Sequence, residues 1–233
     1  SYLGWKSSPV ALNMLQAAAA VGQIGLSQAW FQSFLKYGVK AAQLLLTHDD
    51  FADRARYLNA KSTLTTLLNF PVVPIINEND TVATSELTLG DNDKLAALVC
   101  NLIEADLLVI LTDKEGLMTA DPVKHLDAKL VKHSNVHAIE LDKFASGGGA
   151  WGRGGMVTKI EAARLAARSA PSTIIASGIE QNVLSDISSG REIGTLLFSS
   201  SEKTTARKQW LGGLLRTKGS IVLDDGACTA LLN

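Results

Sequence analysis

Hydrophobic and polar positions follow two regular spacings along this chain. After Ser8-Pro9, which resembles a helix cap with proline at the first helical position, apolar residues keep helical spacing as far as Leu35, and Gly38 is a natural stop. Continuous or nearly continuous apolar runs predict strands between the helices. The expected strands are 39–46, 72–76, 107–111, 172–176 and 195–198. The run 107–111 is the most apolar of them and is typical of a strand covered on both faces.

Helical spacing predicts further helices between these strands. They are expected from Asp49 or Asp50, either of which can cap, to about Leu68, then over 94–104, over 156–170 and briefly after Asn182. Residues 119–150 are expected to be irregular, with a hairpin near Leu130-Val131. Because strands and helices alternate, the sequence predicts an α/β fold: a three-layer αβα sandwich around a mostly parallel, open sheet.

Composition narrows the classes of protein that fit. The chain has 233 residues, 46% hydrophobic and 19% charged, which suffices for one large α/β domain. A net charge of −1 and a pI of about 6.4 give no electrostatic case for nucleic acid or an anionic membrane. No run approaches the roughly 20 apolar residues of a membrane span. Two cysteines without a framework fit a reducing cytoplasm, and Cys100 is expected to be buried.

The chain divides near its C-terminal end. The glycines of 212–219 resemble a linker, so residues 1–213 are expected to form one domain, 214–218 a linker and 219–233 the opening of another unit. The N-terminal end opens directly on the approach to a helix, with no strand before it. The sequence is therefore expected to lack a first strand and to stop within a second domain.

Two blocks of acids and amides carry the first chemical signal: one from Asn77 to Asp80, one from Gly90 to Asp93. The first ends a strand and the second opens a helix, the positions where open α/β sheets bind ligands. Carboxylates and amide oxygens accept from an ammonium, whereas an amide and a helix N-terminus donate to a carboxylate. An amino acid is thus a suitable ligand. The candidate residues are Asn77, Asp80, Asp91, Asn92 and Asp93. The alternative is helix capping by Asp91 or Asn92, which explains only part of the cluster.

Two further segments have chemistry that suits a nucleotide. Thr112-Asp113 at the end of the strand 107–111 can present a hydroxyl and a carboxylate, although a polar turn with Gly116 at positive φ is the alternative. The glycine-rich loop 146–155 leads into a helix whose first turns hold Lys159. Backbone N–H groups, the helix dipole and the lysine together favour polyphosphate, and Arg153 adds a cation. A flexible surface loop is the alternative.

Other motifs in the chain give weaker signals. Gly147, Gly149 and Gly152 match G-x-G-x-x-G, but residues 140–143 before them are not a convincing buried strand, so a dinucleotide-binding oxidoreductase is disfavoured. No Walker A motif occurs. His133 and His137 have the spacing of metal ligands on a helix, yet no third ligand is near, and no metal site in the protein is predicted.

Four segments occur in the order seen in one family. They are 74–80, 90–93, 111–117 and 154–159, and the AAAAVGQ segment 17–23 agrees with them. The chain thereby resembles the glutamate 5-kinases, within the amino acid kinase superfamily, over about residues 9–213. This resemblance implies ATP-dependent phosphorylation of the L-glutamate γ-carboxylate to γ-glutamyl phosphate, the first step of proline synthesis, with Mg²⁺ assisting.

The resemblance also implies roles for single residues. Asp80 and Asn92 would contact glutamate with Asn77 and Asp91 nearby, Lys159 would be the transition-state cation, and Asp93 would orient the catalytic groups. The implied nucleotide-site residues are Thr112, Asp113, Arg153, Gly154, Gly155, Met156, Val157, Thr158 and Lys159. Arg153 and Val157 depart from the family, where threonine and serine or alanine are common, so nucleotide affinity could differ.

The resemblance extends to partners and to missing parts. Proline would be a feedback inhibitor at a site overlapping that of glutamate, a homo-oligomer is expected, and residues 219–233 would begin a PUA domain. The family's first strand, its lysine and glycine-rich phosphate loop, and a serine-containing glutamate loop would lie before Ser1. The competing hypothesis is accordingly a catalytically inactive fragment that only binds ligand or assembles, or another member of the superfamily.

Overall fold

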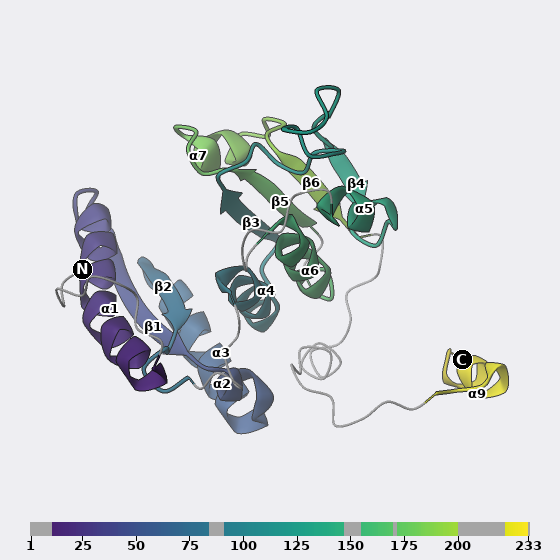
Figure 1. The fold of residues 1–233 in the computed structure, drawn as a ribbon. Coiled ribbons are helices and arrows are strands. Elements are labelled where there is room, and N and C mark those ends of the chain that lie inside the picture. The colour runs from purple at the N-terminus through teal and green to yellow at the C-terminus, as the bar shows by residue number, and fades with distance from the viewer. Residues whose placement is uncertain (1–10, 84–90, 147–154, 170–171, 200–221, 233) are drawn as a thin grey trace.

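The strands form two sheets in the computed structural model, which describes residues 11–83, 91–146, 155–169, 172–199 and 222–232 (Figure 1). The first sheet pairs β1 (Lys40–Leu46) with β2 (Val72–Glu78) in parallel. The second has the order β3-β5-β6-β4. Its strands are β3 (Leu107–Thr112), β4 (His133–Asn135), β5 (Ser172–Ser177) and β6 (Thr195–Phe198).

Most of the strand pairs are parallel, as the alternation of elements predicts. Strand β3 runs parallel to β5, and β4 runs parallel to β6, whereas β5 and β6 are antiparallel. The α/β fold with mostly parallel strands is therefore confirmed. Within the described residues β2 and β3 are each the edge of a separate sheet, rather than neighbours in a single one.

Helices occupy the connections between successive strands except the one between β3 and β4 (Figure 1). Helix α1 packs on β1, α3 lies against β2, and α4 and α6 pack against each other. The helices are α1 (Leu12–Leu35), α2 (His48–Ala52), α3 (Arg54–Leu68), α4 (Asn92–Ile103), α5 (Glu140–Ser146), α6 (Met156–Ala166), α7 (Val183–Ser188) and α9 (Asp225–Leu232). The expected linker 214–218 lies outside the described residues. Within the described ranges, no helix is both long and apolar enough to cross a membrane.

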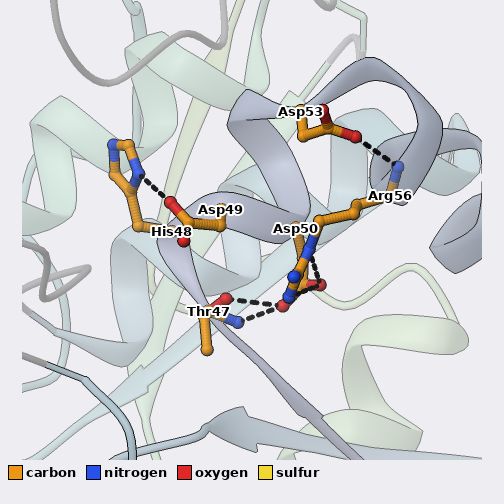
Figure 2. A network of polar contacts seen from close by, with 6 residues as sticks. All are labelled: Thr47, His48, Asp49, Asp50, Asp53 and Arg56. Atoms are coloured by element: carbon orange, nitrogen blue, oxygen red, sulfur yellow. Dashed lines mark hydrogen bonds and ion pairs between the residues drawn. The ribbon is translucent and has the colours of Figure 1, made fainter.

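The helix expected from Asp49 or Asp50 to Leu68 is in fact two helices, and Figure 2 shows why. Thr47, not either aspartate, is the N-cap of α2, and its N–H and hydroxyl donate to Asp50 Oδ2 at 2.6 and 2.7 Å. Asp53 then turns the chain with an extended ψ of 127° and accepts from the Arg56 N–H at 2.9 Å. The Arg56 guanidinium also reaches Asp50 Oδ1. Two successive caps therefore interrupt the helical spacing.

Helix α4 belongs to both hydrophobic clusters of the structure. Leu95, Leu98 and Leu102 pack with residues of β1 and α3, whereas Ala97 and Cys100 pack with the second sheet and α6. Because close-packed interiors have low compressibility and transmit strain, one helix shared by two clusters couples the position of β2 to that of β3. The start of α4, which carries three of the candidate residues, is therefore held from both sides.

Helix α1 differs from the other helices. It contains no charged residue, and none of its residues is buried in this chain. Ile24 is 70% exposed, and Trp30 and Phe31 are each 46% exposed. Helices that are apolar all round are usually covered on more than one side, so this exposed surface is unusual for a helix that packs mainly on β1 among the described elements.

Several local expectations need correction. Strand β3 is covered on one face only within the described residues, because Leu107 and Leu111 are exposed while Leu108 and Ile110 are buried. Gly116 has no positive φ; instead a Cβ there would lie 2.7 Å from the Thr195 hydroxyl, so the glycine permits close packing. The segment 119–150 holds β4 and α5 in addition to the expected hairpin, which is confirmed by bonds between 117–119 and 129–131.

The two cysteines should differ in reactivity. Cys100 is 4% exposed, and burial, with a smaller contribution from the Asp106 charge, raises its pKa to about 11, whereas Cys228 is exposed. The thiolate is the nucleophile, so Cys100 should react about a hundred times more slowly than an ordinary thiol. We expect iodoacetamide at pH 8 to modify Cys228 alone, with Cys100 reacting after unfolding in urea, as measured by peptide mass spectrometry. Equal labelling of both native thiols would contradict this.

Candidate active site

The first block of acids and amides lies at the carboxyl end of β2. Asn77 is within the strand, paired with Leu45 of β1, and the Asn79 N–H donates to the Leu46 carbonyl at 2.8 Å. A turn follows, in which the Asn79 carbonyl accepts from the N–H groups of Val82 and Ala83 at 3.2 and 3.1 Å. Asp80 lies inside this turn. The strand and the turn together present Asn77 and Asp80 at one edge of the sheet.

Asp80 is a partly desolvated carboxylate. The residue is exposed overall, but the burial of part of its surroundings raises the pKa of the carboxyl above its ordinary value, opposed by a bond from its own backbone N–H. Desolvation penalises a charged group that has no counter-charge. A cationic group beside Asp80 would offset that penalty.

The second block forms the start of α4. Asp91 is the N-cap, and its Oδ1 accepts from the Lys94 N–H at 2.9 Å, so the capping alternative is confirmed for this residue. Asn92 lines a cavity of about 370 Å³ that also touches Pro74 and Ile76 of β2. Asn92 at the start of α4 and the middle of β2 thus border one space. Most of its lining is apolar, so Asn92 is the lining residue best suited to contact a polar ligand.

Asp93 contacts the residues predicted to act on phosphate. The Lys159 Nζ lies 2.8 Å from Asp93 Oδ2, although the two residues are 66 positions apart. Their side chains are only 12% and 17% exposed. The Thr158 hydroxyl reaches the same oxygen at 3.5 Å. A little-exposed, charge-assisted bond of this length holds both partners in one geometry. The pair therefore joins the start of α4 to the start of α6.

The start of α6 has the features of an anion-binding helix end. Gly155 is its N-cap, and an added Cβ would meet no atom of the described residues within 4 Å, so these residues leave the approach to the first turn open on that side. Met156 and Val157 form that turn, with Val157 46% exposed. First-turn N–H groups have no partner within a helix, and the dipole favours negative charge there. Arg153 and Gly154 lie outside the described residues.

Thr112 and Asp113 occupy the end of β3. The Thr112 hydroxyl donates to Asp113 Oδ1 at 3.2 Å, and Lys114 Nζ lies 3.2 Å from Asp113 Oδ2. The bonds from Lys114 and Thr112 hold the pKa of this exposed carboxyl below its ordinary value. Sequence reasoning missed Lys114; its only signal is its place next to Asp113. The Gly178 N–H donates to the Thr112 carbonyl at 2.8 Å and ties β3 to the end of β5.

The structure brings some of the candidate residues together and leaves others apart. Asp93, Thr158 and Lys159 are in direct contact, and Asn92 shares a cavity with β2. Thr112 and Asp113 contact each other and Lys114, and among the described residues no hydrogen bond or ion pair joins them to Lys159. In the described part of the chain, no group of three or more His, Cys, Asp or Glu side chains is arranged to hold a metal ion.

The chain is similar to known proteins of one family. The model of the amino acid kinase family matches residues 2–177. A protein named glutamate 5-kinase from Pseudomonas syringae pv. tomato is 57% identical over 232 residues, which are 99% of this chain and 62% of that protein. Its namesake from Pseudomonas fluorescens strain Pf0-1 has the same identity and coverage. The chain thus spans 62% of the length of these curated relatives.

Solved structures support the fold. Carbamate kinase from Giardia lamblia bound to AMP-PNP has a TM-score of 0.57 at 15% identity, covering 84% of this chain and 75% of that one. UMP kinase from Ureaplasma parvum has a TM-score of 0.53 at 14% identity, with coverages of 83% and 73%. At these identities the likeness concerns architecture alone. The family match covers most of the chain and confirms the expected superfamily: the chain belongs to the amino acid kinase family.

Proposed function

We propose that the full-length protein transfers the γ-phosphoryl group of ATP to the γ-carboxylate of L-glutamate. The product would be γ-glutamyl phosphate, and the reaction would be the first step of proline biosynthesis. One observation carries the proposal: the Asp93–Lys159 pair joins the acid and amide cluster to the anion-binding start of α6. The names of the relatives that are 56–57% identical agree with it.

The amino-acid side of the site would hold glutamate between β2 and α4. Asp80 and Asn77 offer oxygen acceptors that suit the ammonium, and Asn92 offers an amide that suits a carboxylate. Asp91, which caps α4, would act by fixing the helix start. The γ-carboxylate would then point toward Lys159, where the phosphoryl group arrives.

The nucleotide side would lie at the carboxyl end of β3 and the start of α6. The described residues proposed to contact ATP are Thr112, Asp113, Gly155, Met156, Val157, Thr158 and Lys159, with Arg153 and Gly154 proposed from sequence alone. Lys159 would stabilise the charge that develops on the transferring phosphoryl group, which is the main task in such reactions. Asp93 would keep the Lys159 ammonium in place.

Magnesium fits this site only as an ion that arrives with the nucleotide. The described residues build no cage of carboxylates, and Mg²⁺ commonly binds through substrate phosphates with one or two carboxylates and several waters. Asp113, whose pKa is lowered, stays charged at neutral pH and could serve as one such carboxylate. Bound there, the ion would offset negative charge on the phosphates.

Partners and location are part of the same proposal. A homo-oligomer is supported by the uncharged, exposed α1, which can face its own copy without like-charge repulsion. Proline carries the ammonium and carboxylate that the glutamate site would recognise, so inhibition by proline is proposed. Two free cysteines fit a cytoplasmic location, and residues 219–233 are proposed to open a PUA domain.

A coupled assay of ADP release tests the activity. The full-length protein should turn over ATP with glutamate, and much less with aspartate or N-acetylglutamate. Turnover with either of these but not with glutamate would refute the assignment. The same assay on the 233-residue chain addresses the alternative of an inactive fragment, because clear glutamate-dependent activity would exclude it.

Asp80→Asn should separate ligand binding from stability. Losing the carboxylate removes a charge-assisted bond to the ammonium, so KM for glutamate should rise at least about tenfold. Because the folded-state pKa of Asp80 is raised, the charged form costs stability near neutral pH, and this cost fades as pH falls through that pKa. The variant should therefore melt at an equal or slightly higher temperature at pH 7. A lower melting temperature for Asp80→Asn together with an unchanged KM for glutamate would contradict both results expected for this variant.

Asp113→Asn should instead raise KM for ATP.

A further inference from the structure

Two glutamine side chains of helix α1 contact the two ends of the segment 77–83. Gln23 and Gln16 are about two helical turns apart and so lie on the same side of α1. Each is partly buried, unlike most of this helix. Each reaches a residue more than fifty positions away: Asn77 from Gln23, and Ala83 from Gln16. The segment between these two contacts carries Asp80.

Gln23 decides which atom Asn77 can offer to a ligand. The Asn77 Nδ2 donates to Gln23 Oε1 at 2.9 Å. The side-chain amide of Gln23 is itself held, because its Nε2 donates to the Ser27 hydroxyl at 3.3 Å. That hydroxyl in turn donates to the backbone carbonyl of Gln23 at 2.8 Å. With Nδ2 directed at Gln23, the Asn77 carbonyl Oδ1 is the atom turned the other way. Oδ1 is an acceptor, which suits an ammonium and not a carboxylate.

Gln16 holds the other end of the segment. Its Nε2 donates to the Ala83 carbonyl at 3.0 Å, and Ala83 is only 7% exposed. Ala83 also closes the turn around Asp80 through its N–H bond to the Asn79 carbonyl. A backbone anchor at this point limits the positions that the Asp80 carboxylate can take.

We propose that Gln23 and Gln16 are positioning residues that clamp the segment 77–83 and thereby set its preference for a ligand ammonium. This inference rests on the proposed glutamate site. Gln23 acts through Asn77 and Gln16 through the Asp80 turn, and neither glutamine touches the reacting atoms. The clamp predicts an effect on the binding of the amino acid that leaves ATP binding and the chemical step unchanged.

The test compares Gln23→Ala, Gln16→Ala and Gln32→Ala in the full-length protein. Gln32 is an exposed glutamine of the same helix and is the matched control. Gln23→Ala should raise KM for glutamate about five- to tenfold, the effect of one hydrogen bond, with kcat and KM for ATP within twofold of wild type. Gln23→Glu keeps an acceptor for Asn77 and should recover part of the loss. Glutarate lacks the ammonium, so the ratio of kcat/KM for glutamate to kcat/KM for glutarate should be smaller in Gln23→Ala than in the wild type.

A second readout is independent of activity. Amide hydrogen exchange of peptides covering 77–83 should accelerate in Gln23→Ala and Gln16→Ala but not in Gln32→Ala. Two results would overturn the clamp without affecting the proposed function: unchanged exchange in both variants, or a KM for glutamate in Gln23→Ala within twofold of wild type. Absence of wild-type turnover with glutamate overturns the proposed function instead, and the exchange data then decide the clamp alone.

Discussion

Lys159→Ala in the full-length protein is expected to lower kcat by about 10²–10³-fold while KM for glutamate and ATP changes little. That is the usual loss when one preorganised donor to a developing negative charge is removed. The structure explains why water should not replace it well. The Lys159 side chain is 12% exposed and is held by Asp93 at 2.8 Å, so its ammonium is already oriented before the reaction. Initial rates over a range of both substrates measure the effect.

Controls separate charge from position in this prediction. Lys159→Arg keeps the charge but changes the geometry of the pair with Asp93, so it should recover only part of the rate. Lys132→Ala removes an exposed lysine whose pair with Glu192 spans 3.6 Å, and should leave kcat unchanged. An effect of Lys159→Ala on KM alone would place this lysine in ground-state binding and not at the transition state.

The strands were the most predictable part of the fold. Each expected apolar run is a strand in the structure, and β6 has the expected bounds, Thr195–Phe198. A buried strand needs only a short continuous apolar run, so its signal is local. Pairing is not local: nothing in the run 195–198 distinguishes a strand antiparallel to β5 from one more parallel neighbour.

At Asp53, local capping ends one helix and begins another, although the spacing of apolar positions predicts a single helix. Apolar positions continue at helical spacing through this residue, yet its side chain caps α3 and its backbone ends α2. Both effects are worth only about 1 kcal/mol, too little to show in a pattern of hydrophobic positions. Short elements such as β4 and α5 were not predicted for a related reason, since three to seven residues carry little periodicity.

Residue types at the candidate site could be found from sequence, but their contacts could not. The blocks around Asp80 and Asp93 stand out because they are dense in acids and amides. The contact between Asp93 and Lys159 depends on how α4 packs on α6, where Asn101 also donates to the Leu165 carbonyl at 2.8 Å. Gln23 had no chemical signal of its own, because a glutamine in an alanine-rich helix is ordinarily a solvated residue. Its role is visible only in the bond to Asn77.

Gly194→Ala is expected to destabilise the fold by more than about 4 kcal/mol, or to prevent folding. Gly194 has a φ of 71°, and an added Cβ would lie 2.1 Å from the Ile175 carbonyl oxygen and 2.9 Å from the Ala176 Cβ. The first of these is backbone of β5, which is bonded on both sides by β3 and β6 and cannot yield as a side-chain end does. Losses of this size arise from few mechanisms, and a clash with the backbone of an interior strand is one of them. Urea unfolding monitored by tryptophan fluorescence measures the loss, and soluble yield reports it if the variant does not fold.

Gly190→Ala isolates the backbone-strain part of this effect. Gly190 has a φ of 83°, so alanine there suffers the same left-handed backbone strain, but its Cβ would meet nothing within 4 Å. That strain alone costs about 1–2 kcal/mol. The difference between the two variants therefore measures the clash with β5. The two free energies of unfolding should differ by more than about 0.5 kcal/mol, the tolerance within which effects at independent sites usually add. If they do not, β6 can move away from β5, and the close approach of the two strands does not constrain the sheet.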